Sequence, residues 1–567
     1  KVRTSVEELA AGATPTFPTV AAPLVRATKL RRALVPGFFS RLEFSDSEAK
    51  FSDQATLLEI EASHFLAGED LNAALRLHRF VTDKATSLNA NEPAIRVEDV
   101  FMALGVGANQ LFPAPSKLVA DPDAVPRRQE RDIADQIAQA SAPVLILASG
   151  GVGKSVLATR LCDLMPAGSQ TVLFDCFANG EYRQPANLRH PHRKALVQIA
   201  NELATRGLCL PLVPTPAADA QDYMRGLIDR LTQASLAVRA KAPEGLVVIL
   251  VDAADNAQMA AEEADTPAFV QDLLRQPLPA GVRLAMLCRP ERRHLLKPPE
   301  ATLSIELTGF EFGETAALLR RAYPAATEAQ IEVFHRLSSH NPRVQANALA
   351  SEVGLPATLR SLGPNPTSVS DTIGSQLARA VSKLKDETPG AAGDIDTLCV
   401  AMAVLRPFIP LKVLAAMTGL SVDALHSFAS DFGRGRWLLV SGDAVQFRDE
   451  PVEEWFRQTY SASQAELQTF LERLLPLADI FPYVAATLPS LMLKCGRLDD
   501  LIALALSSER LPADSPLDRR EIQIERLRFA LRASLTSGRY LEASKLAAKA
   551  AEETAGQARH ETLIEDN

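Results

Sequence analysis

The chain has 567 residues, which is too long for a single hydrophobic core and indicates roughly three or four domains. Hydrophobic residues make up 47% and charged residues 23%, as in ordinary soluble globular proteins, and only 5% are aromatic, which favours a helix-rich architecture. The formal net charge of −9 argues against a broad nucleic-acid-binding surface.

The six cysteines are scattered, without a CxxC pair or histidines at metal-ligand spacing, so we expect reduced thiols and a cytoplasmic protein. There is no signal peptide, and no apolar run approaches the roughly 18 residues that cross a bilayer, so we expect no membrane association. The chain begins at Lys1 rather than Met and ends at Asn567 just beyond an Ala-rich stretch, so we expect a piece of a longer protein.

Residues 1–120 are predicted to form a mostly helical N-terminal and linker region without recognisable chemistry. Apolar spacing predicts a helix pair over 53–84, broken near Gly68, and another helix over 97–105. We interpret this region as the remnant of an effector domain or as the linker to a missing one.

Residues 121–300 are predicted to be an α/β domain with a parallel sheet. Short apolar runs that predict strands alternate with longer helical patterns, which is typical of a parallel sheet with crossover helices. The expected strands cover residues 143–147, 172–176, 246–252 and 283–289. A strand-like run over 303–307 then leads into helices, and residues 301–365 are predicted to be a helical domain.

Two further domains are predicted. Over 366–462, helices precede two short strands at 437–440 and 445–447, a pattern typical of a winged helix. Over 463–567, Gly496 and Gly538 lie 42 residues apart (538 − 496), each between amphipathic helices. This spacing predicts the start of tetratricopeptide (TPR)-like sensor repeats, although two unrelated helical hairpins would give the same pattern.

The segment from Ala148 to Ser155, Ala-Ser-Gly-Gly-Val-Gly-Lys-Ser, lies between an expected strand and an expected helix. A glycine-rich turn that opens into a helix N-terminus forms a cradle for phosphate groups. Lys154 is predicted to reach the β- and γ-phosphates of a nucleotide and Ser155 to bind Mg²⁺. The predicted nucleotide-binding residues of this loop are Gly150, Gly151, Val152, Gly153, Lys154, Ser155 and Val156.

Polar residues follow the next expected strands. Asp252, at the end of its strand, is predicted to bind Mg²⁺, and Asp255 to orient the attacking water; capping of the next helix is the alternative for Asp252. Arg289, at the end of the following strand, is predicted to contact the γ-phosphate, and a surface ion pair with Glu291 is its alternative.

This motif order resembles that of STAND NTPases, which include the NACHT and NB-ARC (NLR-like) proteins of animal and plant immunity. The phosphate loop is followed by Val-Asp-Ala-Ala-Asp at 251–255, Cys-Arg-Pro at 288–290 and Asn-Pro at 341–342, and then by the winged-helix and repeat patterns. Residues 111–116 and 174–183 are similar to segments of bacterial antiviral STAND proteins (Avs proteins).

The resemblance implies bound ATP or ADP with Mg²⁺, with Pro342 near the adenine and Pro126 and Arg127 on the other side of the nucleotide. Two positions depart from the family pattern. Asn256 stands where many NACHT proteins have Glu, and Asp449 where a histidine often contacts the β-phosphate of ADP. We therefore expect slow hydrolysis, and an ADP-locked resting state is in doubt.

The implied function is a signalling ATPase of bacterial antiviral defence. A phage-encoded protein would bind the repeats and trigger homo-oligomerisation, and nucleic acid would be reached only through a missing effector, commonly a nuclease. A STAND transcription activator is one alternative. Against it, the predicted last helix of the winged helix carries acidic residues that DNA phosphates would repel, namely Asp449, Glu450, Glu453 and Glu454. A chaperone-like housekeeping ATPase is another.

Overall fold

The computed structural model divides the chain into two compact units, one of Phe65–Ala73 with Pro93–Asn567 and one of Lys1–His64 with Ala74–Glu92. The structure describes residues 2–28, 35–36, 64–68, 71–86, 96–183, 188–215, 218–264, 266–349, 354–363, 366, 369–387, 390, 392–405, 408–434, 438–441, 443–447, 450–512 and 516–555.

The smaller unit is helical where it is described. Helices α1 and α2 enclose a small core in which Val6 and Val35 are buried. The predicted helix pair over 53–84 is described only in its second half, which is α5, and residues 53–63 lie outside the described residues. The helix bounds are Val2–Ala10 for α1, Pro18–Thr28 for α2 and Leu71–Thr86 for α5.

A five-stranded parallel sheet forms the centre of the larger unit, in the order β2-β3-β4-β1-β5. The strands are β1 (Val144–Ala148), β2 (Gln170–Asp175), β3 (Val247–Asp252), β4 (Val282–Cys288) and β5 (Leu303–Leu307). All five predicted strands are therefore confirmed. Because β5 pairs with β1, the sheet continues past the predicted boundary at 300.

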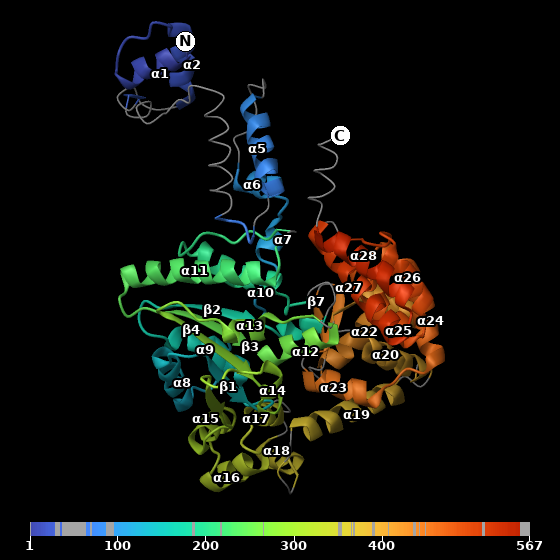
Figure 1. Cartoon of the computed structure of the whole chain (residues 1–567). Coiled ribbons are helices and arrows are strands. Elements are labelled where there is room, and N and C mark those ends of the chain that lie inside the picture. Colours follow the sequence, from blue (N-terminus) through green and yellow to red (C-terminus); the bar gives the residue numbers. More distant parts are fainter. Residues whose placement is uncertain are drawn as a thin grey trace. The chain divides into compact units, whose positions relative to one another are not determined.

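Helices cover both faces of this sheet (Figure 1). The six residues of β3 are all buried; Ile249 packs under α10 and α11, and its neighbours Val248 and Leu250 pack under α8 and α9. This alternation explains why a central parallel strand is an unbroken apolar run. The helix bounds are Arg128–Gln139 for α8, Lys154–Leu164 for α9, His192–Thr205 for α10 and Ala220–Lys241 for α11.

Shorter helices surround this domain. Before it lie α6 (Val97–Ala103) and α7 (Ala108–Leu111); within it lie η2 (Ala178–Arg183), α12 (Ala254–Ala264), α13 (Phe269–Arg275), η4 (Pro290–Arg292) and α14 (Arg293–Leu296). A small helical domain follows β5 and has its own core, to which Leu319, Ile331 and Phe334 belong. It consists of α15 (Phe312–Ala322), α16 (Glu328–Leu337), α17 (Pro342–Leu349) and α18 (Leu355–Ser361).

The predicted winged helix is confirmed, with one strand more than the sequence suggested. The added strand β6 is only two residues long, too short to show a periodic pattern, and it pairs with β8. The elements are α19 (Val369–Glu387), α20 (Ala392–Val404), β6 (Ile409–Pro410), α21 (Leu411–Thr418), α22 (Val422–Arg434), β7 (Leu438–Ser441), β8 (Ala444–Phe447) and α23 (Glu450–Thr459).

Two helical hairpins at the C-terminal end share one turn geometry. Gly496 and Gly538 have φ of +71° and +69°, and each N–H donates to the carbonyl oxygen three residues before it, Leu493 or Leu535. The same glycine bond ends other helices of the chain, for example at Gly105 and Gly207, so the two hairpins are observed while their being copies of one repeat stays a prediction. The elements are α24 (Gln464–Leu474), η6 (Leu475–Asp479), α25 (Pro482–Lys494), α26 (Leu498–Leu506), α27 (Pro516–Thr536) and α28 (Tyr540–Ala555).

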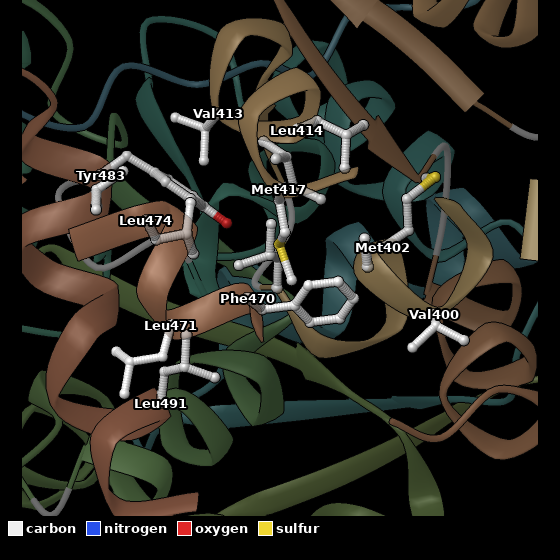
Figure 2. Packing of buried hydrophobic residues seen from close by; sticks show 14 of the residues in the cluster. Val400, Met402, Val413, Leu414, Met417, Phe470, Leu471, Leu474, Tyr483 and Leu491 are labelled. Atoms are coloured by element: carbon white, nitrogen blue, oxygen red, sulfur yellow. The ribbon is translucent and has the colours of Figure 1, made fainter. Parts of the chain in front are cut away.

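The winged helix and the repeats share a continuous hydrophobic core. Figure 2 shows Val413, Leu414 and Met417 of α21 beside Phe470 and Leu474 of α24. All five side chains are at most 2% exposed, so these helices bury one another without a polar boundary at the predicted junction near 462. In the part of the chain that the structure describes, no helix is long and apolar enough to cross a membrane.

Candidate nucleotide-binding site

The predicted phosphate loop connects β1 to α9. Gly151 and Gly153 adopt φ of +81° and +96°, a backbone region that side-chain-bearing residues rarely occupy. Helix α9 begins at Lys154, so its first N–H groups and its dipole face the loop. Gly150, Gly151, Val152 and Gly153 form the turn, and Lys154, Ser155 and Val156 form the first turn of the helix.

Asp252 lies at the C-terminal end of β3 and is 1% exposed. Its Oδ2 accepts a hydrogen bond of 2.7 Å from Ser155 Oγ, which joins the two predicted Mg²⁺ ligands. Burial raises the pKa of Asp252 above its ordinary value, against the opposing charge of Lys154. Ser155 Oγ and the Asp252 carboxylate thus lie together at the end of β3, beside the phosphate loop.

The donor set fits a magnesium ion. Oδ1 of Asp252 is buried and accepts no hydrogen bond from the described residues, so an oxygen ligand is left for a cation. One carboxylate and one hydroxyl, with phosphate and water oxygens, are the ligands that Mg²⁺ prefers in nucleotide sites. No group of three or more His, Cys, Asp or Glu within the described ranges is placed to hold a metal, so the protein alone supplies only part of such a site.

Asp255 lies in the first turn of α12, is 0% exposed, and faces two cations. Lys154 Nζ is 3.9 Å from its Oδ1, and Arg292 Nη1 is 3.4 Å from its Oδ2. The turn from β3 into α12 passes through Ala253, whose φ is +55°. Asn256, the next residue after Asp255, is 2% exposed and places an amide beside this carboxylate in the chain.

Arg289 was predicted from the sequence, whereas Arg292 was not. Arg289 is partly exposed at the start of η4, directly after β4, and its carbonyl oxygen accepts a hydrogen bond of 3.1 Å from the Arg292 N–H. The structure therefore places two arginines three residues apart at this edge of the sheet. The sequence around Arg292 carries no signal that separates it from its exposed neighbour Arg293.

Arg127 binds the protein's own backbone. Its guanidinium donates to the carbonyl oxygens of Val152, Thr308 and Gly309, at 3.0, 2.7 and 2.9 Å. Its Nε lies 3.4 Å from a carboxylate oxygen of Glu314. This side chain thus joins the phosphate loop to the segment between β5 and α15, while the neighbouring Pro126 is exposed. Contact of either residue with a nucleotide stays a prediction.

The helical domain reaches the phosphate loop at the start of α17. Asn341 Nδ2 donates to the Gly150 carbonyl oxygen at 2.9 Å, and the Arg343 N–H donates to that of Gly151 at 3.2 Å. Asn341 Oδ1 also accepts from the Arg343 N–H at 3.0 Å, as a helix cap does. Pro342 is the first residue of α17, and its contact with adenine stays a prediction.

Asp175, at the end of β2, is buried beside Asp252 in the sheet register. Its Oδ1 accepts from the Phe177 and Ala178 N–H groups at 3.0 and 2.8 Å, and its Oδ2 from Lys117 N–H at 3.3 Å. Asp175 therefore anchors the segment before the domain. The Lys117 bond holds the chain just after residues 111–116 at the end of β2.

Of the acidic residues predicted on the last winged-helix helix, Asp449 lies outside the described residues. Glu453 of α23 is buried and forms a 2.9 Å ion pair with Arg457, so it does not contribute to an exposed acidic face as the sequence suggested.

A parallel sheet of this strand order, a phosphate loop after β1 and a buried aspartate at the end of β3 define a P-loop NTPase fold. Helical, winged-helix and TPR-like repeat domains follow it along the chain. No protein-family model matches the sequence, and no curated protein matches it.

Solved structures with similar folds share little sequence with this chain. A STAND protein with a tetratricopeptide repeat sensor from Pyrococcus horikoshii is 12% identical with a TM-score of 0.40; the match covers 77% of this chain and 60% of that one. A Walker-type ATPase of Pyrococcus abyssi is 12% identical with a TM-score of 0.34, over 61% of this chain and 99% of that chain.

A RuvB mutant of Thermotoga maritima is 10% identical with a TM-score of 0.25, over 60% of this chain and 96% of that one. This chain thus spans less than two thirds of the Pyrococcus horikoshii protein. Since these likenesses are distant, the assignment of the fold rests on strand order and the phosphate loop.

Proposed function

We propose that this chain binds ATP with Mg²⁺ and hydrolyses it slowly, as the switch of a STAND-type signalling protein. The observation that carries this proposal is the 2.7 Å hydrogen bond between Ser155 and Asp252 at a phosphate loop whose lysine faces the same edge of the sheet. A hydroxyl and a buried carboxylate converge there on the position that a nucleotide-bound cation takes in P-loop proteins.

Each residue has a role in the proposed reaction. Lys154 binds the β- and γ-phosphates, and Ser155 and Asp252 hold Mg²⁺, which would neutralise charge on the phosphate oxygens when bound. Asp255 orients the attacking water and accepts its proton. Arg289 approaches the γ-phosphate and stabilises the charge that develops on it.

The rate of hydrolysis is proposed to be low. Asp255 lies between the side chains of Lys154 and Arg292, and the next residue, Asn256, offers an amide that cannot accept a proton as a carboxylate does. A slow enzyme suits a switch, because the nucleotide state then lasts long enough to report a binding event.

The order of the domains supports a sensor role. We propose that the repeats over 463–567 recognise a phage-encoded protein and that recognition leads to homo-oligomerisation in the bacterial cytoplasm. An effector domain of the kind that the resemblance implies would supply any action on nucleic acid. The bonds of Asn341 and Arg343 to the phosphate loop are a direct route from nucleotide to helical domain.

Calorimetric titration of ATP tests the nucleotide part of the proposal. Lys154→Ala should abolish binding because it removes the charge that faces the phosphates. Asp252→Asn should reduce, on the order of tenfold, the gain in affinity that Mg²⁺ provides, while binding without Mg²⁺ persists. Undiminished binding by Lys154→Ala would remove the phosphate-loop assignment.

Turnover and particle size test the sensor part. The full-length protein should hydrolyse ATP slowly alone, and should assemble and change its turnover when lysate of phage-infected cells is added. Lysate of uninfected cells is the control. Steady turnover with no assembly under either condition would contradict the sensor proposal and favour a housekeeping ATPase.

A further inference from the structure

Asp255 is a carboxylate with no access to solvent that is held between two cations. Lys154 comes from the phosphate loop and Arg292 from η4, and each faces a different carboxylate oxygen, at 3.9 and 3.4 Å. A buried carboxylate without a partner is strongly destabilising, whereas one that keeps a partner is tolerated. The second cation therefore matters whenever the first one leaves.

Lys154 has two competing anions. Its Nζ lies 3.9 Å from Asp255 Oδ1, and in the proposed function it must turn toward the phosphates of ATP. The cost of this transfer depends on what remains beside Asp255. With Arg292 in place, the carboxylate keeps a charged partner, so the transfer leaves no isolated buried charge.

Arg292 is held beside Asp255 by contacts that do not involve the phosphate loop. It ends η4, its N–H donates to the Arg289 carbonyl oxygen, and the following helix α14 packs against α12, which carries Asp255. Its side chain is 17% exposed, while that of Arg293, the next residue, is exposed. The two helices thus hold the Arg292–Asp255 pair independently of the phosphate loop.

We propose that Arg292 is a positioning residue that releases Lys154 from Asp255 and so sets the affinity for ATP. The proposal rests on the proposed function, since it assumes that Lys154 binds phosphate. It assigns to Arg292 an effect that acts through Asp255 and requires no contact between Arg292 and the nucleotide.

A double-mutant cycle on ATP binding tests this proposal. Arg292→Gln should weaken binding about tenfold, because Lys154 then remains as the counter-charge of Asp255. Asp255→Asn removes the competing carboxylate, so Arg292→Gln should have no further effect in that background. Arg292→Lys should restore most of the affinity because it restores the positive charge.

The measurement is calorimetric titration of the intact protein with ATP in the presence of EDTA, so that neither Mg²⁺ nor turnover contributes. Arg293→Gln is the matched control, since it removes an equal charge from the adjacent exposed position, and it should bind as the wild type does. Thermal unfolding of each variant without nucleotide shows that the fold is retained.

Three outcomes would overturn the inference. These are binding of ATP by Arg292→Gln as by the wild type, a loss of affinity for Arg292→Gln that persists in the Asp255→Asn background, and an equal loss of affinity for Arg293→Gln. A loss of affinity that persists in the Asp255→Asn background would show that Arg292 contacts phosphate directly. An equal loss for Arg293→Gln would show a general electrostatic attraction of ATP. Failure of the wild type itself to bind ATP would instead contradict the proposed function.

Discussion

Asn341 shows how one side chain serves two parts of the chain. Its Oδ1 caps α17, while its Nδ2 binds the carbonyl oxygen of Gly150 in the phosphate loop. A Cβ atom at Gly151 would lie only 2.7 Å from Asn341 Oδ1, so the loop and the helix approach as closely as glycine allows. The bond from Asn341 to the loop is therefore possible only because residue 151 has no side chain.

Replacement of Asn341 should separate these two contributions. Asn341→Ala removes both the cap and the bond to Gly150, and should lower the free energy of unfolding by about 1–2 kcal/mol. Asn341→Asp keeps the cap acceptor but loses the donor, so it should fall between Ala and the wild type. Urea denaturation measures both. Full stability of the Asp variant would show that the bond to Gly150 contributes nothing.

Helices α10 and α27 come from distant parts of the chain and are joined by an ion-pair cluster. Glu521 lies 2.6 Å from Arg193 Nη2 and 3.5 Å from Lys194 Nζ. Burial alone would raise the pKa of Glu521, but the two cations outweigh it and lower the pKa from about 4.5 to about 2. Ion pairs between α10 and α27 therefore connect the P-loop domain to the repeats.

This pKa shift gives the contact a defined pH dependence. Because the folded protein holds Glu521 ionised more strongly than the unfolded chain does, the contact stabilises fully above about pH 4.5. That contribution should decline as the pH falls through the window from about 4.5 to about 2. The melting temperatures of wild type and Glu521→Gln should thus differ more at pH 7 than at pH 3.

The exposed residue Glu472 of α24 offers a control for general acid effects. Glu472→Gln should follow the wild type at both pH values. A difference between wild type and Glu521→Gln that grows toward pH 3 would contradict the assignment.

Across the larger unit, hydrophobic packing does not follow the predicted domain boundaries. The winged helix and the repeats are buried against each other through α21 and α24, where Met417 and Leu474 are fully buried (Figure 2). A core that two domains share unfolds cooperatively, since neither part retains its buried surface without the other. The two domains are thus expected to act as one folding unit.

Leu474→Ala tests this cooperativity. The substitution should cost about 2–5 kcal/mol through lost contacts and a cavity, and it should lower hydrogen-exchange protection in α21 as well as in α25. Leu541→Ala, at a 67% exposed position of α28, is the matched control and should change stability by less than about 0.5 kcal/mol. Loss of protection confined to the repeats would indicate separate folding units.

Local pattern was sufficient for the order of the elements. The five strands, the phosphate loop, the winged-helix hairpin and the glycine turns at 496 and 538 were all predictable. Apolar periodicity and glycine at positive φ act between residues close in sequence, so they can be found without knowledge of the fold. The two-residue strand β6 carried no such pattern and was missed.

Only the tertiary structure shows which residues far apart in the chain contact each other. Sequence alone placed Lys154, Ser155, Asp252 and Asp255 in one site, because the ends of parallel strands meet at one edge of a sheet. It could not show that Arg292 faces Asp255 across 37 residues, or that Asn341 binds Gly150 across 191. Such pairs depend on the packing of whole helices, which local spacing does not encode.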